Sequence, residues 1–442
     1  MESSMKRIVL LKFALATLVL IIPLFSTGYS QNYSSKIEPR LQAVLSSANP
    51  SDLIEVYAIF QNRLTLDDLQ AMTSGLQRVE KRREVVHILK SHAATIQRPV
   101  LEYLYQEENT GEVDRIEIIW AVNVIGFHAT PRVITTLASS FPEIEIIKYD
   151  PPIPLEEMLD DNGYSRNGTP VAPTATPQQG LILINAPLVW AEGDSGQGVI
   201  VANVDTGTDW DHPDLVNNIW NNPGEDADGD GRTLVKVGNT WMFDPDDING
   251  IDDDGNGKVD DFIGWDFTSN DNNPDDLDGH GTATAGLVAG DGTSGTATGV
   301  APRAKIMVLR AASGGQTVMW ASYQYAFENG ADVTTSSLSL KWGPHQPDYA
   351  TFRAMTDMEL AAGLVHTNST GNQGNQSTPG CNNNYPIPYN ISTPGNCPSA
   401  WIHPDQGTLI GAVSSVIGCG NVNAFTDIIE GSSGKGPAAW ED

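Results

Sequence analysis

Short apolar runs alternate with helix-like segments from residue 181 onward, and this alternation constrains the fold more than any other feature. The run at 199–204 is apolar apart from one Asn and ends in Asp205-Thr206-Gly207, as a buried parallel strand would. Similar runs lie at 305–309, 333–340, 364–367 and 409–413, and helix candidates lie at 280–290, 315–329 and 347–362. Strands that alternate with helices form a parallel sheet covered on both faces, so we predict an α/β domain over 181–442.

Residues 31–150 show a different pattern, which predicts a small α+β domain. Strand candidates lie at 53–60, 115–128 and 143–149. A helix candidate runs from Leu66 to about His92, with one apolar side made of Leu69, Leu76, Val79, Val86 and Leu89. Six prolines follow within 151–180, and this composition predicts an exposed linker that is open to proteolysis.

The first thirty residues have the pattern of a secretory signal. Basic residues precede the apolar run 13–25, and Gly28-Tyr29-Ser30 offers small residues at the two positions that a signal peptidase reads. A membrane anchor is the alternative, but the run is short of the ~20 residues of a bilayer span. We expect cleavage after Ser30, an extracellular protein and no stable membrane anchor. Export would permit disulfides, so Cys381 and Cys397 could pair and leave Cys419 alone.

The charge of the chain is strongly negative and unevenly distributed. With 55 Asp and Glu against 25 Lys and Arg, the sequence excludes nucleic acid as a partner, because phosphate binding needs clustered positive charge. Between Asp205 and Asp278 there are 21 acidic residues and three basic ones. So many carboxylates repel one another unless they are solvated or bound to cations.

Two stretches in this acidic region place oxygen ligands at alternate positions around a glycine turn. Their side chains are those of Asp226, Asp228 and Asp230, and of Asp252, Asp254, Asn256 and Asp260. The second stretch follows the first half of an EF-hand loop, but its twelfth position is Ile263 rather than Glu. Oxygen ligands at this spacing suit a hard cation. A solvated loop is the alternative, and we expect structural Ca²⁺ in an acidic insertion at about 221–275.

Three polar residues lie at junctions between predicted elements, where the active groups of a parallel sheet gather. Asp205 ends a strand, His280 precedes a helix of small residues, and Asn372 follows an apolar strand. Each alone has a common structural explanation, as a strand-closing Asp, a capping His and a turn-forming Asn. An Asn amide at such a place could also stabilise an oxyanion by ~3 kcal/mol.

The three residues together, in the order Asp, His, Asn, resemble the subtilisin-like serine proteases (subtilases). The segments that carry the resemblance are 196–207, 212–215, 278–282, 299–302, 304–306, 371–374 and, displaced by one residue, 431–437. The likeness covers roughly 181–442, and residues 31–150 are similar to the inhibitory propeptide of the family.

The resemblance implies a secreted serine endopeptidase that hydrolyses peptide bonds in proteins. His280 would be the general base, Asp205 would orient it, and Asn372 would stabilise the oxyanion. An extended edge at 337–343 would pair with substrate backbone. The propeptide would act as intramolecular inhibitor and chaperone, released by cleavage within about 150–180.

The family nucleophile is missing, because the motif Gly-Thr-Ser-Met-Ala-x-Pro does not occur in the sequence. Gly292-Thr293-Ser294 begins like it but continues differently, and Ser432 and Ser433 precede the place of the motif. We therefore expect an incomplete catalytic domain that is inactive as given. The alternative is a non-catalytic secreted protein that binds calcium and peptide on the same scaffold. A metal-dependent hydrolase built on His280 is disfavoured, because no further His stands at ligand spacing.

Overall fold

The computed structural model describes residues 34–159, 177–293, 295, 298–341, 346–374, 390–397 and 415–434. The chain divides into two compact units. One unit comprises 1–61, 97–116 and 127–149, and the other comprises 62–96, 117–126 and 150–442. The predicted signal segment 1–30, residues 160–176 of the predicted linker and the strand predicted at 409–413 lie outside the described residues.

The N-terminal part forms a four-stranded sheet with the order β2-β3-β1-β4. Its strands are β1 Ile54–Phe60, β2 Val113–Ile119, β3 Val124–Ala129 and β4 Ile144–Tyr149. The accompanying helices are α1 Pro39–Ser47, α2 Leu66–Met72, α3 Arg78–Glu108 and α4 Pro131–Ser140. This is the predicted mixture of strands and helices, and β1 pairs with β4 in antiparallel register.

Two predictions for this part were wrong in detail. The single helix predicted from Leu66 is broken into α2 and α3, because Gly75 between them adopts a left-handed φ of +83°. The predicted apolar side is broken with it, since Leu76 and Val79 are exposed. The strand predicted over 115–128 is two strands, separated by a 3₁₀ turn at Trp120–Val122.

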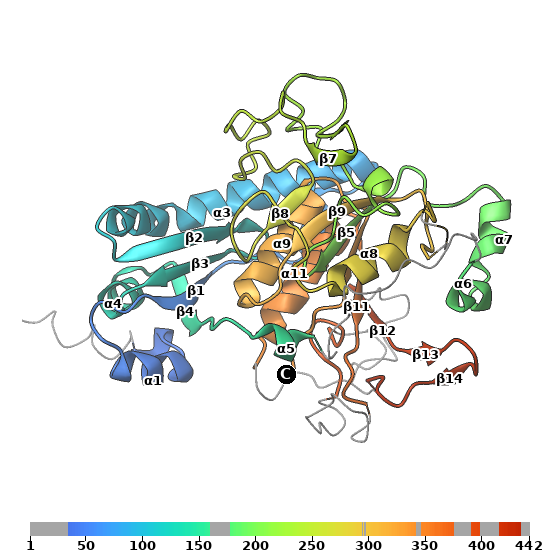
Figure 1. The fold of residues 1–442 in the computed structure, drawn as a ribbon. Coiled ribbons are helices and arrows are strands. Elements are labelled where there is room, and N and C mark those ends of the chain that lie inside the picture. The colour runs from blue at the N-terminus through green and yellow to red at the C-terminus, as the bar shows by residue number, and fades with distance from the viewer. Residues whose placement is uncertain are drawn as a thin grey trace, which may run out of the picture. The chain divides into compact units, whose positions relative to one another are not determined.

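A six-stranded parallel sheet forms the centre of the second unit, with the order β12-β11-β10-β5-β9-β8. Figure 1 labels all of these strands except β10. Its strands are β5 Ile200–Asp205, β8 Gly264–Asp266, β9 Lys305–Arg310, β10 Val333–Ser336, β11 Val365–Ser369 and β12 Val416–Cys419. The predicted α/β fold is thus confirmed. β10 ends at Ser336, before the predicted end at 340, and Leu340 instead makes an antiparallel bridge to Thr393.

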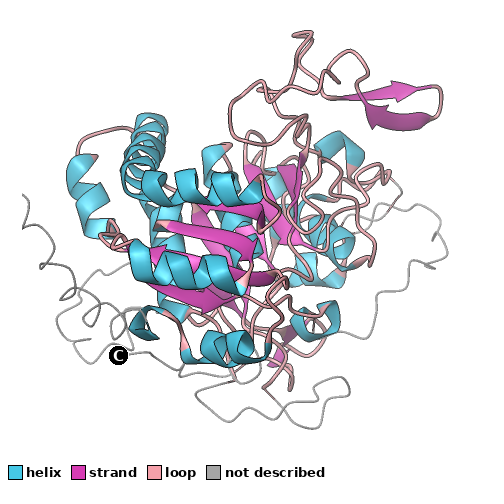
Figure 2. Ribbon diagram, turned by 90° about the vertical axis from the view of Figure 1, so that its left-hand side faces the viewer, coloured by secondary structure: helices cyan, strands magenta, loops and turns pink. Residues whose placement is uncertain are grey.

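The three helices predicted between the strands are present as α8 His280–Ala289, α9 Gln316–Glu328 and α11 Tyr349–Ala361. Figure 2 shows helices on both faces of the sheet. Ala285 and Ala289 of α8 pack in one core cluster with alternate residues of β9, Ile306 and Val308. Because side chains alternate along a strand, the fully buried Met307 lies on the opposite face, where α9 contacts β9.

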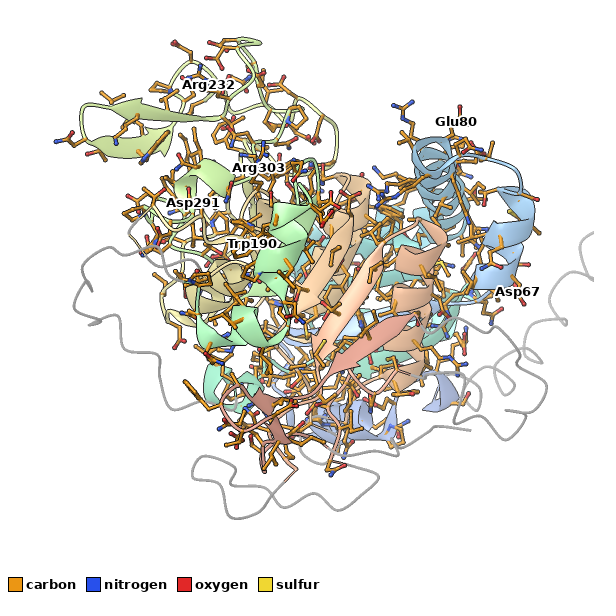
Figure 3. The ribbon with its side chains drawn as sticks, turned by 90° about the vertical axis from the view of Figure 1, so that its right-hand side faces the viewer. Asp67, Glu80, Trp190, Arg232, Asp291 and Arg303 are labelled. Atoms are coloured by element: carbon orange, nitrogen blue, oxygen red, sulfur yellow. The ribbon has the colours of Figure 1, made fainter. Side chains whose placement is uncertain are left out.

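The remaining elements of the second unit are short. They are α5 Leu155–Met158, α6 Gln179–Leu183, α7 Ala186–Ala191, the hairpin β6 Leu234–Val237 with β7 Thr240–Phe243, and the ribbon β13 Val422–Asn423 with β14 Ile428–Ile429. Trp190 anchors α7, since its ring N–H donates to the carbonyl of Val300 at 2.9 Å. Figure 3 labels Trp190, and also Arg232 in the acidic insertion. Among the described residues, no helix combines the length and the apolar character that crossing a bilayer requires.

Candidate active site and acidic insertion

Asp205 and His280 are in direct contact at the carboxyl end of β5, an interior strand of the sheet. His280 Nδ1 lies 2.5 Å from Asp205 Oδ1, and the Asp205 side chain is fully buried while that of His280 is 11% exposed. Asp205 is the last residue of β5, and His280 is the first of α8. Gly281 permits the approach of the two segments, because a Cβ there would lie 2.0 Å from the carbonyl oxygen of Gly207.

Further hydrogen bonds fix the Asp205 carboxylate. The amide of Thr206 donates to Oδ1 at 2.8 Å, and the hydroxyl of Thr284 on α8 donates to Oδ2 at 3.1 Å. Both carboxylate oxygens are therefore held, with one directed at the imidazole. This arrangement can keep a proton on His280 Nδ1 and can stabilise an imidazolium, which would leave Nε2 as the nitrogen for proton exchange with a reactant.

Asp276 is a buried carboxylate that no sequence pattern predicted. Its Oδ1 accepts the hydroxyl of Thr206 and the amides of Asp278 and Gly279 at 2.8–2.9 Å, and its Oδ2 accepts the amide and hydroxyl of Thr282 at 2.8 and 2.6 Å. Burial alone would raise the pKa of Asp276, but hydrogen bonds from Thr282 and the amides outweigh burial and lower it. Through these hydrogen bonds Asp276 connects Thr206, the residue after Asp205, with the chain on both sides of His280.

Asn372 lies in the loop that follows β11 and is half-buried. The loop needs glycine at 371, where φ is +80° and a Cβ would lie 2.4 Å from Ser392 Oγ. The oxyanion role of Asn372 stays a prediction. In the predicted substrate edge, both backbone groups of Leu340 are bonded to Thr393, and residues 342–343 lie outside the described part of the chain.

A cavity of about 210 Å³ adjoins the Asp205 contacts. Asn203 and Thr284 line it next to Asp205, and the ends of β10, β11 and β12 supply most of the remaining wall, including Ser336, Ser369 and Cys419. Cys419 is an exposed free thiol and Cys397 a buried one. These two thiols form no disulfide with each other. Cys381, the partner considered for Cys397, lies outside the described residues, so that pairing stays a prediction.

Parts of the predicted propeptide belong to the second unit and contact α9 and its surroundings. Gln324 of α9 accepts the amide of Ala121 at 3.0 Å, and Lys90 forms an ion pair with Glu328. The buried carboxylate of Asp150 accepts the amides of Gln316 and Thr317 at 2.7 and 3.2 Å. Asp150 therefore caps the N-terminus of α9, where backbone N–H groups have no partner within the helix.

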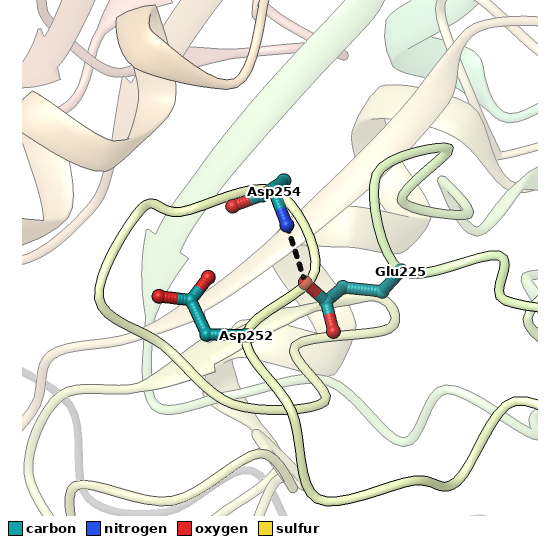
Figure 4. A group of neighbouring side chains, drawn as sticks. All are labelled: Glu225, Asp252 and Asp254. Carbon is teal, nitrogen blue, oxygen red and sulfur yellow. Dashed lines mark hydrogen bonds between the residues drawn. The ribbon is translucent and has the colours of Figure 1, made fainter.

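Carboxylates of the acidic insertion form two groups. In each group, ligand oxygens of three residues lie within 4.8 Å of one another. The groups are Asp226, Asp228 and Asp247, and Glu225, Asp252 and Asp254 (Figure 4). Of the residues predicted as metal ligands, Asp230 and Asp260 lie outside both groups, and the Asn256 amide donates to Asp254 and Asp261. Glu225 and Asp247 were not predicted as ligands, because they do not stand at the alternate positions around a glycine turn that indicated the other residues.

The composition of the groups fits a hard cation. Glu225 and Asp247 are both only 1% exposed, and Glu225 Oε2 and Asp247 Oδ2 have no hydrogen-bond partner among the described residues. Burial and the neighbouring Asp254 and Asp253 raise the pKa of Glu225 to about 7, and burial raises that of Asp261 to about 8. Carboxylate oxygens without nitrogen or sulfur ligands are the set that Ca²⁺ prefers.

Comparison with known proteins identifies the family. The family model described as "Subtilase family" (Peptidase_S8) matches residues 196–441. Bacillopeptidase F of Bacillus subtilis (strain 168) is 28% identical over 236 residues, which are 53% of this chain and 14% of that protein. The major intracellular serine protease of the same organism is 29% identical over 218 residues, or 48% of this chain and 54% of that protein.

A shorter match concerns the calcium-dependent protease of Trichormus variabilis, which is 46% identical over 72 residues, 16% of this chain and 10% of that protein. The chain thus spans at most about half the length of these curated relatives. The family match alone includes more than half of the 442 residues. The chain belongs to the subtilase family, whose members are serine peptidases.

Proposed function

We propose that the chain carries the acid–base part of a secreted subtilisin-like endopeptidase, which hydrolyses peptide bonds in proteins. The observation that carries this proposal is the 2.5 Å contact between His280 Nδ1 and the buried Asp205 in a subtilase chain. His280 would take the proton of the attacking serine through Nε2 and return it to the leaving amine. Asp205 would hold the tautomer and stabilise the imidazolium.

The other components of the reaction are less complete in this chain. Asn372 would donate its amide N–H to the oxyanion, an interaction worth ~3 kcal/mol in a preorganised site. The motif that carries the nucleophilic serine in the family does not occur in the 442 residues. We therefore propose that this polypeptide does not hydrolyse peptides by itself. A non-catalytic protein that binds calcium and peptide would be equally inactive.

We also propose the domain organisation of an exported zymogen. Residues 1–30 would be a signal peptide, 31–150 a propeptide, 151–180 a linker and 181–442 the peptidase domain. The contacts of Ala121 and Asp150 with α9 support a propeptide that assists folding of the peptidase domain and inhibits it. The amide of Ile153 also donates to the carbonyl of Gly314 at 3.3 Å, so the segment after the propeptide runs along the loop before α9.

A chimera distinguishes the catalytic from the non-catalytic alternative. The chain is extended with the nucleophile segment of the major intracellular serine protease of Bacillus subtilis. We expect a fluorophosphonate probe to label the added serine and a casein substrate to be hydrolysed, because Asp205 and His280 supply the missing base. Both activities should fall to background in the His280→Ala chimera.

The control for this experiment is His87→Ala, which removes an exposed imidazole of α3 and should leave labelling unchanged. Circular dichroism establishes that each chimera is folded. A folded chimera that is labelled equally well without His280, or not labelled at all, would contradict the catalytic proposal. The second of these outcomes would favour the non-catalytic alternative.

Calcium is the cation that we propose for the acidic insertion, with a structural role. The buried oxygens of Glu225 and Asp247 that find no partner among the described residues support it, because an uncompensated buried charge is costly. The name of the calcium-dependent relative from Trichormus variabilis is consistent with it. The ions would hold together an insertion whose carboxylates otherwise repel.

Removal of calcium should lower the melting temperature. An ion present at 100 times its Kd stabilises the folded state by about 2.7 kcal/mol, so we expect a loss of roughly 5–10 °C per ion on addition of EDTA. Differential scanning calorimetry with EDTA, compared with EDTA already saturated by calcium, measures the shift. An identical melting temperature in both solutions would contradict bound calcium.

A further inference from the structure

The two glycine-turn stretches of the acidic insertion fold into equivalent loops. In the first, the Asp226 carboxylate accepts the amides of residues 229, 230 and 231 at 2.8–3.1 Å. In the second, the Asp252 carboxylate accepts the amides of residues 255, 256 and 257 at the same range of distances. Each loop is therefore organised by its own first residue, and its remaining ligands must come partly from elsewhere.

One carboxylate from outside reaches each loop. Glu225 Oε1 accepts the amides of Asp253 and Asp254 in the second loop at 3.0 and 3.3 Å, and the bond from Asp254 is drawn in Figure 4. Asp247 Oδ1 accepts the amide of Asp228 in the first loop at 3.3 Å. In both residues the second oxygen is buried and accepts no hydrogen bond from the part of the chain that the structure describes. Each outside carboxylate thus has one oxygen on the loop backbone and one available to an ion bound there.

The outside carboxylates are exchanged between the loops. Glu225 immediately precedes the first loop but contacts the second, whereas Asp247 lies ahead of the second loop and contacts the first. The neighbours Glu225 and Asp226 therefore belong to different groups, although their Cα atoms are only about 3.8 Å apart. The segment 247–252 connects the two groups a second time.

We propose that the two loops bind Ca²⁺ as a coupled pair, in which Glu225 completes the second site and Asp247 the first. An ion in either site orders Glu225-Asp226 and the segment 247–252, and these are the segments that the other ion also requires. The entropic cost of ordering them is then met by the first ion, so the second binds more tightly. This inference rests on the calcium proposed above and concerns its stoichiometry and cooperativity.

The test is isothermal titration of the full, chelator-treated chain with CaCl₂. We expect two ions per chain and a Hill coefficient above one. Glu225→Gln should remove one ion and weaken the remaining one by about fivefold or more, the lower end of typical coupling between sites. Asp247→Asn should have the mirror effect. Asp253→Asn, which removes an exposed carboxylate outside both groups, should retain two ions and their cooperativity.

Folding of the variants is checked by melting in EDTA, where Glu225→Gln should be at least as stable as the unmodified chain, because it removes a buried unpaired charge. Two independent ions, of which Glu225→Gln removes one and leaves the affinity of the other unchanged, would overturn the coupling but not the calcium proposal. Unchanged binding in Glu225→Gln and Asp247→Asn would overturn the ligand assignment. Absence of any calcium binding would overturn the calcium proposal itself. None of these readouts depends on peptidase activity.

Discussion

Incubated with a fluorophosphonate probe, the purified 442-residue polypeptide should form no covalent adduct, and it should hydrolyse peptides no faster than background. His280 and Asp205 can move a proton but cannot replace an attacking oxygen. In subtilisin itself, loss of the serine lowers kcat by about 10⁶-fold. Mass spectrometry of the intact chain after labelling measures the adduct directly.

Serines line the cavity next to Asp205, so the chain has hydroxyl groups that could react with the probe if the prediction were wrong. Ser336 and Ser369 lie at the carboxyl ends of β10 and β11, as Asp205 does at the carboxyl end of the parallel strand β5. An adduct on either serine that disappears in His280→Ala would show that the chain has a nucleophile outside the family motif. The chimera described above is the positive control for the reagent.

Replacement of Asp276 should have the largest effect on stability. Asp276→Asn keeps the size of the side chain but turns an amide NH₂ toward groups that donate to the carboxylate, so at least one buried donor loses its acceptor. Hydrogen bonds to charged groups contribute about 1.5–3 kcal/mol each, and we expect the free energy of unfolding to fall by about 3 kcal/mol. Denaturant unfolding at neutral pH measures the loss.

The pH dependence separates the charge of Asp276 from its shape. Since the folded state lowers the pKa of Asp276, its contribution to stability is present above the unfolded pKa of about 3.9 and is lost as the pH falls through the folded pKa. The difference between Asp276→Asn and the unmodified chain should therefore be constant near neutrality and shrink only in acid. Asp275→Asn, a half-buried neighbour, is the control, with an expected loss below about 1 kcal/mol. A loss for Asp276→Asn as small as that of the control would contradict the assignment.

The sequence predicted the parallel sheet and its three covering helices because each of these elements has a recognisable pattern in its own residues. The apolar run before Asp205 and the small residues after His280 each span whole elements. The three-residue strand β8 was missed because it is too short to show a period. The break between α2 and α3 was missed because the apolar periodicity continues through it in the sequence. In the structure the left-handed conformation of Gly75 interrupts the helix.

The site was predicted only where residues lie in recognisable local patterns. Asp205 and His280 could be paired in advance because of the family resemblance, although 75 positions separate them. Asp276 could not be found, because its significance comes from a hydrogen bond to Thr206, 70 positions away, and no spacing encodes that bond. Glu225 and Asp247 were missed for the same reason, since each contacts a loop to which it does not belong in sequence.

The cap that Asp150 places on α9 has a consequence for synthesis on the ribosome. Asp150 precedes Gln316 by 166 positions. At an elongation rate of about 5–20 residues per second, Asp150 leaves the exit tunnel of the ribosome roughly 10–30 s before Gln316 does. The acceptor is thus waiting when the first turn of α9 emerges. A polypeptide that began after Asp150 would form the same helix, but the amides of Gln316 and Thr317 would lack their carboxylate acceptor.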